Sequence, residues 1–459
     1  MDVREAILSQ PMRSYQLRIV VICILITMID GYEVLVMAFV APHLAKAWEL
    51  GPVEIGYLLS AGIFGMAVGA TFVSPLADKI GRRRHIIICL ALITLGMGLS
   101  AAAQNVPQMV AFRAFAGLFI GAIISSVNII VSEYSSDKRR GTVMGIYGIG
   151  LNAGVALGGA VTNMLIAAFT WRAPFVFGAI VTAAMCVLAI RTLPESIEYL
   201  IEKRPKRALE HYNAIADKLG YPRGTVLPAA LEPGEMHVTR KALFYGIMLL
   251  RTISLWLAYA CVIAAFYFAN TWTAKLISDA SGDVTLGART GVLIAVGGIL
   301  GALLFAALSL KIRPRIVTVA MMFAGAIVFV LYANYYQTTA IALTLAVLVG
   351  MVANGGIAAF YAISPFVFPT TARGTGVGLM IGVGRGVAII APILTGYLLM
   401  GGWTPQDMYQ LFAGFFVVAG VATVVLDRTY KGRSENPDTP EVLEKRLRRR
   451  QAGTEPSQD

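Results

Sequence analysis

Charged residues are scarce in this chain of 459 residues. Only 14% are Asp, Glu, Lys or Arg, whereas 57% are hydrophobic, and the mean hydropathy is +0.71. A typical soluble domain carries about 25% charged residues. The scarcity of charge therefore excludes an ordinary soluble protein and predicts a polytopic membrane protein.

Residues that hold metals or form disulfides are also few. The four cysteines fall inside apolar runs, which gives neither a disulfide framework nor a C-x-x-C metal pattern. The four histidines are dispersed without metal-ligand spacing. The net charge of +12 comes from basic residues scattered between apolar runs and not gathered on one face. We therefore expect no cofactor, no metal and no nucleic-acid partner.

Apolar runs long enough to cross a bilayer fall into two sets of six. They cover residues 17–43, 52–76, 85–104, 107–131, 142–168 and 172–190, then 243–273, 287–310, 315–334, 339–366, 375–400 and 407–427. The predicted fold is an all-α membrane protein with twelve transmembrane helices in two six-helix halves, residues 1–190 and 242–427. A polar linker at 191–241, with short amphipathic helices near 195–200 and 208–210, joins the halves, and a tail follows at 428–459.

The distribution of basic residues predicts the orientation. With both termini placed in the cytoplasm, 31 of the 38 Lys and Arg residues lie on the cytoplasmic side, four lie outside and three lie within spans. Cytoplasmic loops carry an excess of Lys and Arg. We therefore expect a multi-pass protein of the cytoplasmic membrane, in contact with the lipid bilayer, that works as a monomer.

A short repeat supports the division into two halves. Arg140 to Gly145 and Arg373 to Gly378 share the pattern R-G-T-x-x-G, 233 residues apart. Each copy opens the fifth predicted span of its half. Duplicated six-helix halves with the substrate near the membrane midplane are a common plan of transporters.

The first span carries Asp30-Gly31-Tyr32-Glu33 near its middle. Residues three apart share a helix face, so Asp30 and Glu33 can look into the same cavity or bundle interior. An ionised carboxylate at that depth costs roughly 2.5 kcal/mol or more, so each acid should be protonated, paired or hydrated. This is the chemistry of a proton-coupled carrier, and we expect both acids to face a wet central passage. The alternative is that they pair with basic residues and fix helix packing.

The fourth span contains Arg113, Gly117 and Gly121 in the spacing R-x-x-x-G-x-x-x-G. The glycines predict close approach of a neighbouring helix. Arg113 lies within the span, where it can pair with an acid or an anion. We expect it to couple to the acids of the first span.

The loop from Ser74 to Arg84 contains a lone acid among basic residues, S-P-L-A-D-K-I-G-R-R-R. It resembles the loop G-x-L-x-D-R-x-G-R-R/K that marks the major facilitator superfamily. Gly81 allows a tight reversal, and Asp78 can accept bonds from a facing helix terminus or an arginine, forming a latch that opens with the cytoplasmic side. The predicted gating residues are Asp78, Gly81, Arg82, Glu133 and Arg140. For Glu133, a surface salt-bridge cluster with Lys138, Arg139 and Arg140 is the alternative.

Three further stretches resemble the aromatic acid/proton symporters within that superfamily. Asp30 to Glu33 is similar to their D-G-[FY]-D, Pro194-Glu195-Ser196 to their P-E-S segment, and Gly384 to Pro392 to their G-R-x-G-A-I-x-x-P. Glu33 replaces the usual second aspartate. The second-half counterpart of the signature loop, residues 308–315, has no acid, which suggests that this half lacks a matching latch.

The resemblance and the residue types together predict a binding site. Arg385 would hold a substrate carboxylate through bidentate hydrogen bonds. Asparagine amides would contact ring hydroxyls, and aromatic rings would line the site, although aromatic residues in spans also serve as packing or interface anchors. Besides Arg385, the predicted substrate-binding residues are Tyr32, Asn152, Tyr267, Asn270, Trp272, Asn354 and Tyr361.

The predicted function is proton-coupled import of a small aromatic carboxylate, either benzoate-like or hydroxybenzoate-like. The alternatives are an importer of sugars or other neutral metabolites, which a buried Arg385 disfavours, and a proton-coupled drug exporter. Val155 stands where exporters of the superfamily commonly carry proline, which favours uptake. No clustered catalytic groups support an enzyme, and no extramembrane sensory domain supports a receptor.

Overall fold

The fold is helical throughout the residues that the structure describes. The structure is a computed structural model that describes residues 3–228, 246–368 and 373–430. Twelve helices in these ranges are long and apolar enough to cross a membrane. This confirms the prediction of an all-α membrane protein. Most of the predicted tail, 431–459, lies outside the described residues.

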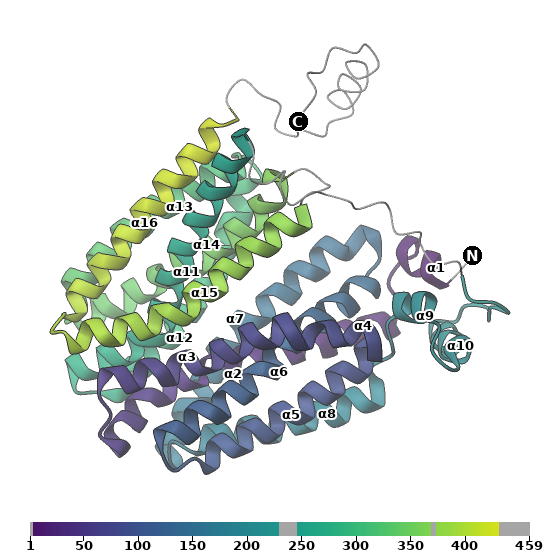
Figure 1. The fold of residues 1–459 in the computed structure, drawn as a ribbon, viewed down its shortest axis with the longest axis horizontal. Helices are drawn as coiled ribbons and strands as arrows, with labels where there is room; N and C mark the ends of the chain where they lie inside the picture. Colours follow the sequence, from purple (N-terminus) through teal and green to yellow (C-terminus); the bar gives the residue numbers. More distant parts are fainter. Residues whose placement is uncertain (1–2, 229–245, 369–372, 431–459) are drawn as a thin grey trace.

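The spans form two bundles joined through two short helices (Figure 1). The first bundle contains α2 (Ser14–Trp48), α3 (Pro52–Val68), α4 (Ala77–Ile80), α5 (Arg82–Ala102), α6 (Val106–Glu133), α7 (Asp137–Ala168) and α8 (Ala173–Thr192). The second contains α11 (Gly246–Ser281), α12 (Val284–Ser309), α13 (Pro314–Tyr335), α14 (Thr339–Val367), α15 (Arg373–Met400) and α16 (Pro405–Arg428). Short helices α1 (Val3–Ser9), α9 (Ile197–Lys203) and α10 (Ala208–Leu219) lie together at one end. The predicted division of the chain at residues 190, 241 and 427 stays a prediction.

Two helices continue five or more residues past the predicted ends of their spans. The first predicted span ends at 43 and the seventh at 273, whereas α2 continues to Trp48 and α11 to Ser281. The added turns of α11 contain Lys275 and Asp279, which form an ion pair one helical turn apart. Opposite charges at this spacing stabilise a helix, so their appearance after an apolar run does not mark its end.

Glycines bring neighbouring helices of the first bundle into close contact. A Cβ atom on Gly117 would collide with the carbonyl oxygen of Gly62, and one on Gly121 with that of Met66. Backbones can approach this closely only where a side chain is absent. The predicted close approach at the fourth span is therefore confirmed, and the neighbour is α3.

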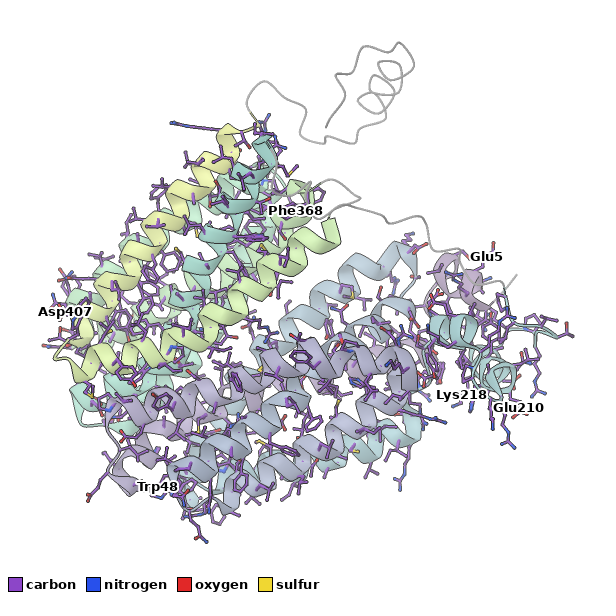
Figure 2. The ribbon with its side chains drawn as sticks, viewed as in Figure 1. Glu5, Trp48, Glu210, Lys218, Phe368 and Asp407 are labelled. Carbon is purple, nitrogen blue, oxygen red and sulfur yellow. The ribbon has the colours of Figure 1, made fainter. Side chains whose placement is uncertain are left out.

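The two bundles meet mainly through α3 with α15, α7 with α12, and α2 with α11. Ser60 donates to the carbonyl oxygen of Ile389 at 2.9 Å, and the hydroxyls of Tyr57 and Tyr397 are 2.8 Å apart. We call the end that carries α1, α9 and α10 the linker end, and the opposite end the far end. Figure 2 shows Glu5 and Lys218 at the linker end and Trp48 at the far end. Tyr57 lies in the first turns of α3, directly after the far end of α2, so this hydrogen bond joins the bundles at the far end.

Candidate functional site

A cavity of about 180 Å³ lies between the two bundles. The first bundle contributes residues from α2, α3, α6 and α7, and the second from α11, α14 and α15. Most of the wall is apolar. Its polar side chains are Asn152, Tyr259, Tyr267, Asn270, Asn354, Tyr361 and Arg385. A mainly apolar wall with a few polar groups is typical of a binding site for a small molecule.

Arg385 on α15 is the one charged residue among those that line this cavity. Its side chain is partly buried, and among the described residues it has neither a hydrogen bond nor an ion pair. A guanidinium cannot shed its charge, so leaving it unpaired at membrane depth is unfavourable. An anion that enters the cavity would therefore gain a strong partner.

Four other polar residues of the wall are held by hydrogen bonds within the second bundle. The Tyr259 hydroxyl donates to that of Tyr361 at 3.1 Å. The side-chain nitrogen of Asn270 donates to the carbonyl oxygen of Phe266 at 2.9 Å, and that of Asn354 to Gly350 at 3.3 Å. Because each amide uses its nitrogen on its own helix, its side-chain oxygen is left to accept a hydrogen bond from a ligand.

The structure brings six of the eight predicted binding residues to this cavity: Asn152, Tyr267, Asn270, Asn354, Tyr361 and Arg385. It does not bring Tyr32 and Trp272 there. The Tyr32 hydroxyl donates to the carbonyl oxygen of Pro174 at 2.6 Å, inside the first bundle. Trp272 is 1% exposed and donates from Nε1 to Pro392 at 3.1 Å. The Tyr32 ring packs within the first bundle, whereas Trp272 lines a separate cavity together with Pro52 and Ile55 of α3.

Sequence reasoning missed Tyr259 and the aliphatic part of the wall. Tyr259, Ile263, Phe266, Tyr267 and Asn270 all lie on α11 and all line the cavity. Their spacing of four, three, one and three residues is that of a single helix face. Extending the predicted face backwards from Tyr267 by two turns would have identified Tyr259.

The acids of α2 do not line the cavity. Asp30 is 2% exposed and Glu33 is fully buried, whereas Gly31, Val34 and Leu35 form the part of the wall that α2 contributes. The expectation that both acids face a wet central passage is therefore wrong for this conformation. They share a helix face, as predicted, but that face is turned into the first bundle.

Inside the first bundle the two carboxylates are only partly satisfied. The Thr182 hydroxyl on α8 donates to Oε1 of Glu33. Oδ1 of Asp30 and Oε2 of Glu33 are buried without a hydrogen-bond partner among the described residues. Burying a polar group without a hydrogen-bond partner is costly, so this packing leaves part of each carboxylate unsatisfied.

Arg113 lies beside Glu33 but contacts its backbone. Its Nη2 donates to the Glu33 carbonyl oxygen at 2.6 Å, and its Nη1 lies 3.2 Å from the sulfur of Met97. The described residues include no ion pair between Arg113 and the Glu33 carboxylate. The structure thus places the cation next to the acids, and its predicted coupling to them stays a hypothesis.

The signature loop forms a tight turn at the linker end. Gly81 has φ +97°, a conformation that side chains rarely allow, and a Cβ there would collide with the Glu195 carboxylate. Asp78 pairs with Arg82 of the same bundle at 2.8 Å, and its side chain is 62% exposed. The predicted reversal at Gly81 is therefore present. The side chain of Arg140 lies outside the described residues.

Glu133 is tied to the linker. Its carboxylate accepts hydrogen bonds from the Ser196 hydroxyl at 2.8 Å and from the Ile197 backbone amide at 2.9 Å, at the start of α9. In the described part of the chain, Glu133 forms these two hydrogen bonds and no ion pair with Lys138 or Arg139. Sequence reasoning singled out Ser196 only as part of a motif, because nothing local reveals a partner 63 residues away.

Two packed helical bundles that enclose a cavity at membrane depth define a membrane carrier of small solutes. The sequence model of the Major Facilitator Superfamily matches residues 21–355 and 255–454. The chain belongs to the major facilitator superfamily, and it is a transporter and not an enzyme.

Similar proteins cover nearly the whole chain. The 4-hydroxybenzoate transporter PcaK of Pseudomonas aeruginosa is 29% identical over 431 residues, 93% of this chain and 95% of PcaK. The gallate transporter of Pseudomonas putida is 29% identical over 402 residues, 87% of this chain and 89% of that protein. The fold matches a solved bacterial homolog of the human lysosomal transporter Spinster, in an inward-facing and unoccupied conformation. The TM-score is 0.71 at 17% identity, over 94% of this chain and 100% of that one.

Proposed function

We propose that this protein is a proton-coupled symporter that imports a small aromatic carboxylate. The observation that carries the proposal is Arg385, a cation without a partner among the described residues, on the wall of a mainly apolar cavity that also carries aromatic rings and three asparagines. The relatives named as 4-hydroxybenzoate and gallate transporters support the same class of substrate.

The substrate would be held at its two ends. The Arg385 guanidinium forms two parallel hydrogen bonds with the carboxylate. The ring lies among Phe266, Tyr267 and Tyr361, where aromatic contacts are favourable. A ring hydroxyl donates to the side-chain oxygen of Asn270 or Asn354. A sugar would bring no negative charge to pair with the guanidinium, so this site favours an acid over a neutral metabolite.

Proton coupling would use Asp30 and Glu33. Both acids are on α2, which also carries Gly31, Val34 and Leu35 on the cavity wall. A movement of α2 between the two states of the carrier therefore changes the contacts of the substrate and the surroundings of the acids together. Thr182 and Arg113, which contact Glu33, favour its charged form when the proton leaves.

The described conformation would be the inward-facing one. In this proposal the linker end is cytoplasmic, in keeping with its Lys and Arg residues. The bundles are joined at the far end by the hydrogen bond between Tyr57 and Tyr397. Among the residues that the structure describes, Asp78 pairs only with Arg82 of its own bundle, which corresponds to the open state of the predicted latch.

The test is uptake by the purified protein in liposomes. Labelled 4-hydroxybenzoate should accumulate when the outside is made acidic, and unlabelled 4-hydroxybenzoate should compete, whereas 4-hydroxybenzamide and xylose should not. The amide keeps the ring and the hydroxyl but lacks the charge. Equal competition by the amide, or accumulation of xylose, would contradict the proposal. Uptake driven only by an acidic interior would indicate an exporter.

A further inference from the structure

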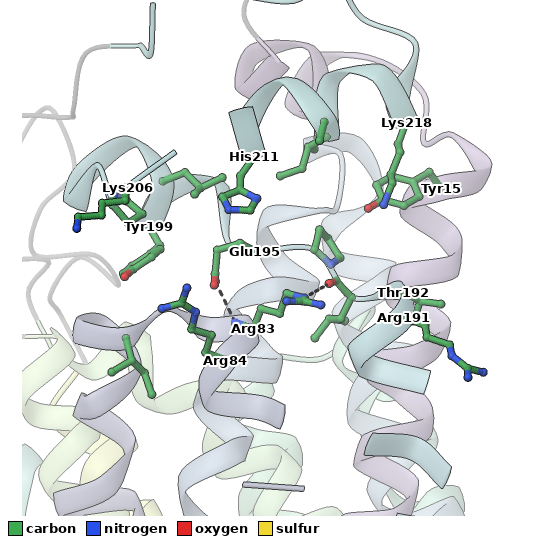
Figure 3. A pocket seen from close by; sticks show the side chains of 17 residues that line it. Tyr15, Arg83, Arg84, Arg191, Thr192, Glu195, Tyr199, Lys206, His211 and Lys218 are labelled. Atoms are coloured by element: carbon green, nitrogen blue, oxygen red, sulfur yellow. Dashed lines mark hydrogen bonds between the residues drawn. The ribbon is translucent and has the colours of Figure 1, made fainter. Parts of the chain in front are cut away.

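A second cavity, of about 290 Å³, lies at the linker end (Figure 3). It is enclosed by the start of α5, the segment after α8, and the helices α9 and α10. It shares no lining residue with the cavity that contains Arg385. The transport cycle proposed above does not use it.

The lining of this cavity is strongly basic. It contains one acid, Glu195, and five cations: Arg83, Arg84, Arg191, Lys206 and Lys218. His211 also lines it. Five positive charges and one negative charge leave a net charge of +4, without counting the histidine. A cleft lined by charges of one sign concentrates ions of the opposite sign.

The single acid does not neutralise these cations. Oε1 of Glu195 accepts hydrogen bonds from the backbone amides of Arg83 and Ser196, each at 2.9 Å. The carboxylate thus caps the start of α5, where the helix dipole favours a negative charge. The ion pairs among the described residues include none between Glu195 and a cation of this cavity.

The cations reach the cavity from two sides. Arg83 is held against α8 by bonds from Nε to the Leu193 carbonyl oxygen at 2.7 Å and from Nη2 to Ile190 at 2.6 Å. Figure 3 shows Arg84 beside it, with His211 on the facing helix α10. The ammonium group of Lys218, also on α10, lies 5.4 Å from the centre of the Tyr15 ring.

Hydrogen-bonding capacity on this wall is unused. Arg84 forms neither a hydrogen bond nor an ion pair with any described residue, and its side chain is exposed. The buried hydroxyl of Tyr15 has no partner among the described residues either. Buried polar groups are normally hydrogen-bonded, so an unpartnered hydroxyl beside several cations points to a ligand.

We propose that this cavity binds an anion that carries a phosphate group. Arginine binds phosphate through parallel hydrogen bonds and lysine binds it as a point charge, and this cavity is lined by arginines at the start of α5 and by Lys218 on α10. Two sources supply this chemistry: the headgroup of an anionic phospholipid, since the lining includes Arg191 and Thr192 at the end of a membrane span, and a soluble phosphate compound. A bound phosphate joins α10 to the start of α5.

The experiment measures phosphate binding by the full-length protein in a nonionic detergent. The melting temperature is followed during titration with pyrophosphate, with phosphatidylglycerol, and with phosphatidylcholine as the zwitterionic control, all at constant ionic strength set with chloride. The variants are Arg84→Gln, Lys218→Gln and the double variant. Lys203→Gln is the matched control, because Lys203 is an exposed cation of α9 outside the cavity.

We expect pyrophosphate, phosphatidylglycerol or both to raise the melting temperature of the wild type and of Lys203→Gln. Each cavity variant should weaken the apparent affinity about tenfold, since each removes one charge-assisted bond. A response to pyrophosphate alone identifies a soluble ligand, and a response to phosphatidylglycerol alone identifies a lipid. The proposal is overturned if neither probe raises the melting temperature, or if the double variant responds like the wild type. Native mass spectrometry of the wild type counts bound phosphate independently of any variant.

Discussion

Replacing Arg385 with alanine should nearly abolish recognition of an aromatic carboxylate. The guanidinium is the one cation on the cavity wall, and no described residue can take its place. Truncating one partner of a hydrogen-bonded charge pair costs about 2–5 kcal/mol. Because every 1.4 kcal/mol is a factor of ten, KM should rise by roughly 30-fold to several thousand-fold.

Two further variants separate charge from geometry. Arg385→Lys keeps the positive charge but loses the bidentate hydrogen bonds, so its KM should lie between those of the wild type and the alanine variant. Arg289→Ala removes an exposed arginine on α12 that does not line the cavity, and it should transport normally.

The assay is counterflow of labelled 4-hydroxybenzoate in liposomes, which needs no proton gradient and so reports substrate binding and exchange alone. Competition by 4-hydroxybenzamide provides a second reading, because loss of the guanidinium should reduce the preference for the acid over the amide. A KM within threefold of the wild type in Arg385→Ala, with an unchanged preference for the acid, would refute the assignment.

The other predictions concern proton coupling and the linker end. Asp30→Asn and Glu33→Gln keep the shape of the acids, so counterflow should persist while accumulation driven by a pH gradient is lost; full accumulation in both would contradict their role. Glu133→Ala leaves two donors at the start of α9 without an acceptor, which costs about 1–3 kcal/mol for each donor. Amide hydrogen exchange in α9 should therefore become faster. Glu133→Gln, which keeps an acceptor oxygen, should restore much of the protection. Gly81→Ala forces a side chain into a positive-φ conformation, which costs about 1–3 kcal/mol and should lower the melting temperature. Gly98→Ala, at a position with open space, should leave the melting temperature unchanged. Equal melting temperatures for the two variants would refute the strain at Gly81.

The number and type of the spans could be predicted because each is an apolar run of membrane length. The end of α11 could not be predicted in this way. Lys275 and Asp279 each look like the end of a span when taken alone, but on one continuous helix they form an ion pair. The contact between Glu133 and Ser196 was hidden for a similar reason: it depends on where two helix ends meet in space.

The residue types of the candidate site could be predicted from the sequence, but the helix faces that line the cavity could be predicted less well. Arg385 and three asparagines on the cavity wall are polar residues that a lipid-facing surface would not hold. Tyr32 follows Gly31 directly, and one step along a helix turns a side chain by about 100°, which is enough to move a ring from the passage into the bundle. The shared face of Asp30 and Glu33 followed from their spacing, but no local signal says whether that face meets a passage or a bundle interior.

The hydrogen bonds at the start of α9 also limit how far the bundles can separate. Glu133 and Glu195 hold the beginning of the linker, and Arg13, just before α2, donates to the carbonyl oxygen of Leu219 at the end of α10. The segment after α10 is held as well, because the Asn213 side chain bonds to Gly224 and Arg204 donates to the carbonyl oxygen of Pro228. Everything up to Pro228 therefore travels with the first bundle. Between Pro228 and the start of α11 at Gly246 the sequence has 17 residues, and a chain of that length can span at most roughly 60 Å.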